Sequence, residues 1–66
     1  MSWIVKKGAV PRIEYYHALK NGLHRWGPDD AIAKQFLDRE EVRVEFNFSD
    51  NELKDSGFVL EEVYLE

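Results

Sequence analysis

The sequence predicts a small α+β domain, in which an antiparallel sheet of three to four strands carries one or two short helices on one face. Three observations lead to this fold class. Apolar residues alternate with polar ones near both ends of the chain. An Asn-Gly pair at residues 21–22 separates the segment 12–20 from the one that follows it, and Pro-Asp-Asp precedes apolar residues at helical spacing. A length of 66 residues predicts a single domain, residues 1–66, with one core.

Two strands are expected in the N-terminal part of the chain, at residues 2–7 and 12–20, because aromatic and β-branched residues alternate there with polar ones. Gly8 ends the first of them. Pro11 lacks a backbone N–H, so we assign it to the connection between the strands.

The pair Asn21-Gly22 predicts a type I′ hairpin turn, because both central positions of this turn need a positive φ. With a two-residue loop, His17 pairs with Trp26. The residues then expected on the core face are Ile13, Tyr15, His17, Leu19, His24 and Trp26. The residues expected on the outer face are Arg12, Tyr16, Lys20 and Arg25. A shift of one residue would exchange the two faces.

A helix is expected from Pro28 to Leu37. Proline suits the first helical turn, and Asp29 and Asp30 follow where the helix dipole favours acidic residues. The apolar stripe of this helix comprises Ile32, Ala33, Phe36 and Leu37. We expect the stripe to pack on the face of the hairpin that carries Trp26.

Residues 39–48 fit two patterns. Asp38 with Glu41 three residues later can cap a helix. However, apolar residues alternate strictly with polar ones over this segment, namely Val42, Val44, Phe46 and Phe48. The sequence favours a strand here, and the helix remains the alternative.

The closing strand is expected at residues 58–65, after a single helical turn capped by Ser49 or Asp50. So small a sheet leaves an unpaired edge strand. A partner protein or a second copy of the chain can add a strand there.

Composition restricts the setting. The chain has no cysteine, no signal peptide and no apolar run long enough to span a bilayer, so we expect a cytoplasmic protein without a membrane partner. Residues 1–37 carry six Lys/Arg and three Asp/Glu, a net charge of +3, whereas residues 38–66 carry three and ten, a net charge of −7. This asymmetry is compatible with an interaction surface or with a solvated acidic face.

No catalytic motif is present. The Glu40-Glu41 and Glu61-Glu62 doublets do not form catalytic pairs by themselves, because neighbouring residues of a strand point to opposite faces. His17 and His24 are the only histidines, and no third metal ligand accompanies them at a metal-binding spacing. We therefore expect neither enzyme activity nor a cofactor or metal.

Two surfaces are candidates for binding. A basic and aromatic surface, formed by Arg12, Tyr16, Lys20 and Arg25, can stack bases and pair phosphates. An acidic surface, formed by Glu40, Glu41, Glu61 and Glu62, can meet a basic protein partner or imitate a row of phosphates.

The segment from Tyr16 through Trp26-Gly-Pro-Asp29-Asp30-Ala-Ile-Ala-Lys-Gln-Phe36 to Glu40-Glu41 resembles a pattern found in short phage and prophage proteins. That pattern has a strand ending in Trp, an Asp-led helix with an Ala-x-x-Phe step, a Glu-rich segment that is usually helical, and a closing strand. The resemblance covers about a third of the chain and implies a bacterial or phage setting. It implies no activity and no site residues.

We therefore expect a small non-catalytic protein-binding module. It is a candidate phage-encoded modulator or inhibitor of a host protein in the host cytoplasm. It would act through its acidic face or its free sheet edge. One alternative is a nucleic-acid-binding domain that uses the outer face of the 12–26 hairpin. Another is a structural or self-assembling small protein, for instance a homodimer.

Overall fold

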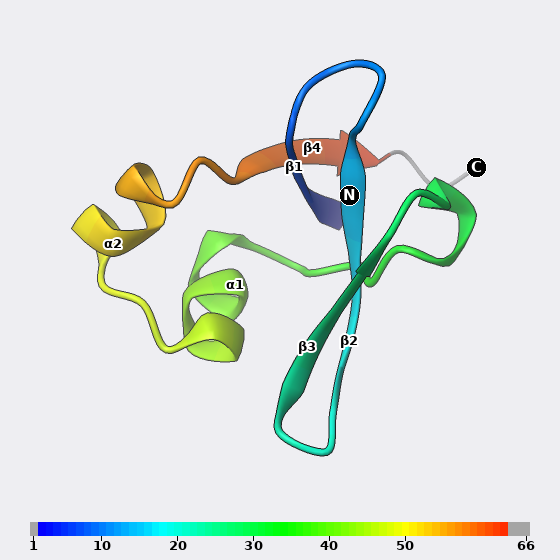
Figure 1. Ribbon diagram of the computed structural model, residues 1–66. Coiled ribbons are helices and arrows are strands. Elements are labelled where there is room, and N and C mark those ends of the chain that lie inside the picture. Colours follow the sequence, from blue (N-terminus) through cyan, green and yellow to red (C-terminus); the bar gives the residue numbers. More distant parts are fainter. Residues whose placement is uncertain (1, 64–66) are drawn as a thin grey trace.

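The computed structural model describes residues 2–63 and contains a four-stranded antiparallel sheet with the strand order β3-β2-β1-β4 (Figure 1). The strands are β1 (Ser2–Lys7), β2 (Glu14–Lys20), β3 (Leu23–Gly27) and β4 (Val59–Val63). Between β3 and β4 lie a 3-10 helix, η1 (Asp30–Ile32), and the α-helices α1 (Arg39–Phe46) and α2 (Asp50–Asp55). The predicted α+β fold class is confirmed. Residues 64 and 65, which the prediction included in the closing strand, lie outside the described residues.

The β2–β3 hairpin turns at Asn21 and Gly22, whose φ angles are 54° and 76°. Positive φ at both central positions is the mark of the predicted type I′ turn. Beside the turn, Leu19 pairs with His24, as the two-residue loop requires. The turn and the register next to it are therefore confirmed.

A β-bulge then changes the register of the hairpin. The pairing shifts between Tyr16 and Ala18, so that His17 becomes the extra residue and Tyr16 pairs with Trp26. Because a bulge adds one residue to one strand only, it exchanges the faces of the residues beyond it. Tyr16 is fully buried as a result, and Tyr15 takes the outer face. The predictions of an exposed Tyr16 and of Tyr15 and His17 on the core face are wrong.

The segment predicted as a helix over residues 28–37 contains only the short η1. Ile32 and Leu37, two members of the predicted apolar stripe, are 61% and 73% exposed. Phe36 alone of the stripe is buried in the core. The helix prediction is therefore wrong for this segment.

Backbone hydrogen bonds explain why this segment is extended. Strands β1 and β2 pair only at Lys6 and Lys7 and diverge beyond them. The N–H and C=O of Phe36 bond to the C=O and N–H of Trp3, each at 2.7 Å, and the N–H of Lys34 donates to the carbonyl oxygen of Tyr16 at 2.9 Å. The segment thus supplies hydrogen-bond partners for the backbones of β1 and β2 where these two strands diverge. These hydrogen bonds outweigh the helical pattern of the sequence.

Helix α1 occupies the segment for which a strand was favoured, so that prediction is wrong and the helical alternative is right. The side chain of Asp38 caps the helix by accepting from the N–H of Glu41 at 3.0 Å. Val42 and Phe46, four residues apart, are buried, whereas Val44 is 72% exposed. The burial therefore follows a helical period and not the alternation of a strand.

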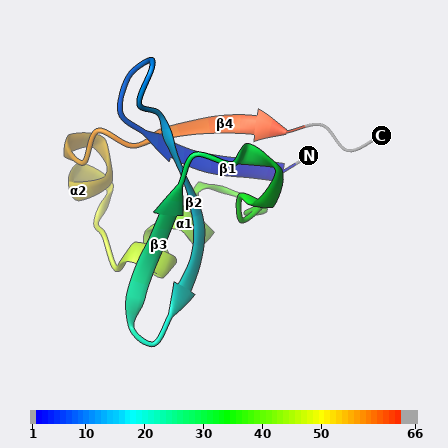
Figure 2. The same ribbon diagram turned by 45° about the vertical axis from the view of Figure 1, so that its right-hand side comes forward.

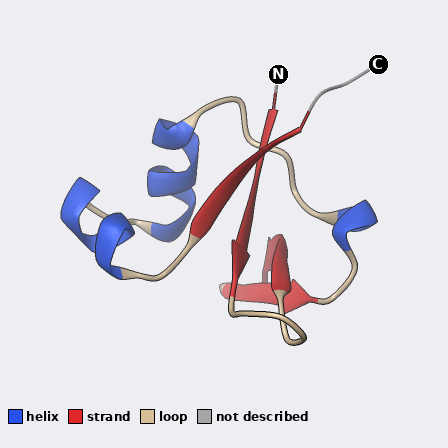
Figure 3. Ribbon diagram, turned by 90° about the horizontal axis from the view of Figure 1, so that it is seen from above, coloured by secondary structure: helices blue, strands red, loops and turns tan. Residues whose placement is uncertain are grey.

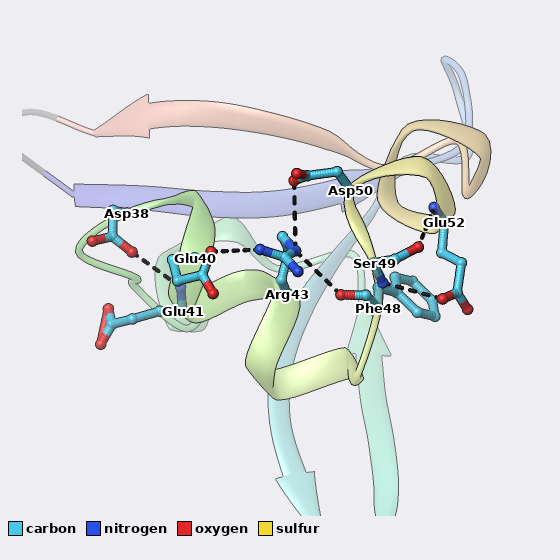
Figure 4. Close-up of polar contacts among 8 residues, drawn as sticks. All are labelled: Asp38, Glu40, Glu41, Arg43, Phe48, Ser49, Asp50 and Glu52. Atoms are coloured by element: carbon cyan, nitrogen blue, oxygen red, sulfur yellow. Dashed lines mark hydrogen bonds and ion pairs between the residues drawn. The ribbon is translucent and has the colours of Figure 1, made fainter.

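Polar contacts hold α1 and α2 in place (Figure 4). Ser49 and Glu52 form a capping box, with distances of 3.2 Å and 3.1 Å, which confirms the predicted capped turn. Arg43 donates from Nη1 to Glu40 at 2.6 Å and from Nε to the carbonyl oxygen of Phe48 at 3.2 Å. Arg43 therefore links the body of α1 to the connection before α2.

The core is an aromatic cluster around Phe46, and both α-helices lie together on one side of the strands (Figure 3). The rings whose centroids lie 4.6–5.9 Å from that of Phe46 belong to His24, Tyr16, Phe58, Phe48 and Trp26. Figure 2 shows β1 and β4 side by side, with the β2–β3 hairpin running away from them. The core thus fills the angle between the two strand pairs and leaves β4 at the edge of the sheet.

Candidate functional site

The predicted basic and aromatic surface loses its aromatic member. Arg12, Lys20 and Arg25 are exposed, and the last two share the outer face of the hairpin. The ring of Tyr16 lies on the opposite face, wholly inside the core. Tyr16 is therefore not available at this surface for stacking with a base.

The buried hydroxyl of Tyr16 belongs to a polar cluster at the border of the core. It donates to Oε2 of Glu45 at 2.7 Å, and Nδ1 of His24 lies 3.2 Å from the hydroxyl oxygen. Nζ of Lys34 donates to the same Oε2 at 2.8 Å. The cluster ties the hairpin to α1 and to the extended segment before it.

Burial and hydrogen bonds shift the pKa values of Tyr16 and Glu45 in opposite directions. Burial raises the pKa of Tyr16, and the hydrogen bond to Glu45 and the negative charge of that carboxylate raise it further. Burial alone would raise the pKa of Glu45, but the hydrogen bonds from Lys34 and Tyr16 and the positive charges of Lys34 and His24 outweigh it and lower this pKa. Tyr16 thus keeps its proton and Glu45 its charge near neutral pH, so neither is poised to exchange a proton with a substrate.

The two histidines have separate local roles. Nε2 of His17 lies 2.8 Å from the carbonyl oxygen of Asp29, and the His17 ring covers Gly27, where an added Cβ would lie 2.7 Å from it. His24 belongs to the polar cluster of Tyr16. Within residues 2–63 no group of three or more His, Asp or Glu side chains could hold a metal ion.

Glu40 and Glu41 lie in the first turn of α1, where both make local bonds. Glu40 accepts from Arg43, and Oε2 of Glu41 accepts from the N–H of Leu37 at 2.6 Å. They line a shallow groove of about 360 Å³ together with Lys34, Gln35, Phe36, Asp38, Val44 and Glu45. Glu61 and Glu62 do not line this groove, because they lie on β4. The acidic residues predicted as one surface are therefore divided between two elements.

Strand β4 presents a free edge. Trp3 directs its backbone N–H and C=O to Phe36, away from β4, so its pair with Glu62 is a non-hydrogen-bonded pair of the β1–β4 ladder. By the alternation of an antiparallel ladder, Val5 and Leu60 form another such pair. The backbone N–H and C=O groups of Leu60 and Glu62 therefore point away from β1, and no further strand of residues 2–63 lies beyond β4.

Carboxylates flank this edge on both faces of the sheet. Glu62 shares a face with its partner Trp3, which is the face toward α2. Glu61 lies on the other face, where its Oε2 is 3.6 Å from Nζ of Lys6. An added strand would thus meet a negative charge on each of its faces at this end of β4.

An apolar groove of about 580 Å³ adjoins the same strand. Four apolar side chains line it, namely Trp3, Leu53, Phe58 and Leu60, and its charged residues are Asp38, Arg39 and Lys54. The volume lies within the range of small-molecule pockets and exceeds that of a single side chain. The sequence did not predict this groove, although Phe58 and Leu60, at alternate positions of the expected closing strand, were a signal for one of its walls.

Comparison of the chain with known protein families, curated proteins and solved structures gives no match. None of the helices within residues 2–63 is long and apolar enough to cross a membrane.

Proposed function

We propose that this chain is a small protein-binding module without catalytic activity, which pairs the edge of β4 with an extended segment of a partner protein. The observation that carries the proposal is the outward direction of the backbone groups of Leu60 and Glu62. Unpaired N–H and C=O groups on an edge strand are a template for a further strand.

Charge supports a basic partner. Residues 38–66 carry a net charge of −7, and the carboxylates of Glu61 and Glu62 flank the edge itself. Such a field attracts a cationic segment and increases its rate of encounter. A role as a phage-encoded modulator or inhibitor of a host protein accords with the small size of the chain and with the pattern that its sequence resembles.

The nucleic-acid alternative receives less support. Its stacking residue, Tyr16, is enclosed in the core, and the positive side chains that remain on the hairpin belong to a chain with a net charge of −4. Base recognition on a sheet needs an exposed aromatic side chain as well as cations, and Tyr15, the tyrosine that the bulge places on the outer face, is partly buried. The proposal therefore rests on the β4 edge and not on the hairpin.

The edge can be tested by substitution at Glu62, whose N–H faces outward. Glu62→Pro removes this donor and leaves the ladder with β1 intact, because proline is tolerated on the free side of an edge strand. Glu62→Gln removes the charge and keeps the donor. The probe is an acetylated, amidated peptide of alternating lysine and threonine, titrated into ¹⁵N-labelled protein.

We expect the peptide to shift the amide signals of Leu60 and Glu62 and to slow hydrogen exchange at both. Glu62→Pro should abolish binding, while Glu62→Gln should weaken it only several-fold. Retention of the melting temperature by Glu62→Pro is the control for folding. Absence of binding at millimolar peptide, or shifts confined to the hairpin, would overturn the proposal.

A further inference from the structure

We propose that the apolar groove beside β4 receives one large apolar side chain of the added strand, and that two basic residues directly precede it in the partner. This inference rests on the proposed strand addition at β4 and specifies the segment that is recognised. From its N-terminus to its C-terminus, the three central residues of the partner segment are basic, basic and apolar.

The position of Leu60 places the apolar residue. Leu60 directs its backbone toward the free edge while its side chain lines the groove. In an antiparallel pair the residue directly opposite has its Cβ about 4.5–5.5 Å away and on the same face. The partner residue opposite Leu60 therefore lies at the groove, and its backbone forms hydrogen bonds with Leu60.

The chemistry of the groove selects the kind of side chain. Trp3, Leu53 and Phe58 form its apolar lining together with Leu60. A large apolar side chain removes this surface from water, whereas a polar one would leave its own groups without partners. Arg39 and Lys54, which line the same groove, form no ion pair with another residue of the described part of the chain. Together with Asp38 they give the groove lining a net charge of +1, which disfavours a basic side chain there.

The two glutamates place the basic residues. In an antiparallel arrangement the residues opposite Glu61 and Glu62 are those one and two positions before the residue opposite Leu60. Opposite charges directly across a pair of strands attract, and like charges repel. Glu62 faces the α2 side and Glu61 the other side, so both basic side chains meet a carboxylate although they point to opposite faces.

The order of the segment follows from strand direction. All neighbouring strands of this sheet are antiparallel, and antiparallel pairing is slightly more stable per residue than parallel pairing. A parallel strand would require the reverse order, apolar, basic, basic. The order of the three residues is therefore an independent prediction of the geometry.

The test uses four acetylated, amidated peptides that differ only in the three central residues of a threonine-rich strand. These residues are Lys-Lys-Phe, Lys-Lys-Ala, Phe-Lys-Lys and Glu-Glu-Phe. The amides of Leu60 and Glu62 report pairing at the edge, and the indole N–H of Trp3 reports occupation of the groove. Dissociation constants come from the same titrations.

Lys-Lys-Phe should bind at least ten-fold more tightly than each of the other three, and it alone should shift the Trp3 indole strongly. Leu60→Thr should reduce the advantage of Phe over Ala. Val59→Thr is the matched control, because Val59 adjoins Leu60 but does not line the groove. The comparison of Phe and Ala in the peptide remains valid even if the protein variants fold poorly.

The outcomes separate this inference from the proposed function. Shifts at Leu60 and Glu62 without a shift of the Trp3 indole would overturn the groove and leave strand addition standing. A preference for Phe-Lys-Lys would overturn the antiparallel order. No shift in β4 with any peptide would overturn both proposals, as would shifts of Leu60 and Glu62 that depend on protein concentration alone, which would assign the edge to a second copy.

Discussion

Replacement of Tyr16 by phenylalanine tests the bulge that organises the core. The variant keeps the buried ring and removes only the hydroxyl that donates to Glu45 at 2.7 Å. A hydrogen bond to a charged group contributes about 1.5–3 kcal/mol, and Lys34 still neutralises the carboxylate. We therefore expect a loss of about 1.5–3 kcal/mol, a large part of the stability of a domain this small.

Urea unfolding at pH 7, followed by tryptophan fluorescence, measures this loss. With a slope near 1 kcal/mol/M, the midpoint should fall by about 1.5–3 M. Tyr15→Phe is the matched control, because Tyr15 lies on the outer face, and its change should stay below about 0.5 kcal/mol. In a Glu45→Gln background, Tyr16→Phe should cost less. A larger loss for Tyr15→Phe than for Tyr16→Phe would mean that the bulge is absent and that our account of the core is incorrect.

Three further predictions concern the core, the pH dependence and a turn. Phe46→Ala should cost about 3–5 kcal/mol in urea unfolding and Val44→Ala less than about 0.5, because the first side chain is at the centre of the core and the second is exposed; similar losses would contradict the orientation of α1. The folded-state pKa of Glu45 lies below its unfolded value, so the stability that Glu45 adds is present above about pH 4.3 and is lost as the pH falls through the folded pKa. Glu45→Gln should therefore reduce the loss of stability at acid pH, and an unchanged pH dependence would refute its assignment to Glu45. Gly8→Ala should lower the melting temperature more than Gly57→Ala, because both have positive φ but only at Gly8 would the new Cβ lie 2.5 Å from a carbonyl oxygen across the turn; equal losses would contradict this close approach.

The parts of the fold that depend on local chemistry could be predicted from the sequence. Asn21-Gly22 specifies its turn through backbone preferences alone, and Ser49 with Glu52 caps α2 through contacts three residues apart. The Asp38 cap was an equally local signal for α1. The alternation of β-branched and aromatic residues after it was misleading, because Val44 is exposed on the helix.

The errors arose where distant parts of the chain decide local structure. The bulge at His17 depends on contacts of Tyr16 with α1, which no hairpin pattern contains. The extended course of residues 34–36 depends on hydrogen bonds to Trp3 and to the β2 backbone. In both places tertiary contacts replaced a valid local pattern.

The candidate site was predictable in part for the same reason. A free sheet edge and the carboxylates of Glu61 and Glu62 follow from the small number of strands and from composition. The groove does not, because Trp3 and Leu53 come from segments fifty residues apart in sequence and meet only in the folded chain. Its single local signal was the alternation around Leu60.

The charge of the two sheet edges favours a foreign partner over a symmetric dimer. A two-fold pairing of β4 with its own copy, centred on Glu61 or on Glu62, places that carboxylate opposite itself, which is destabilising. A pairing centred on Leu60 avoids this repulsion but places Glu61 and Glu62 opposite Val59 and Phe58, so that neither carboxylate meets a cation. The other edge strand, β3, carries Arg25 and could attract β4 of another copy, but such a contact is heterologous and leads to open chains unless the rotation closes a ring. Addition of a basic strand from another protein satisfies the edge of β4 without either consequence. We expect light scattering to show a monomer at high protein concentration and the basic peptide to bind at Leu60.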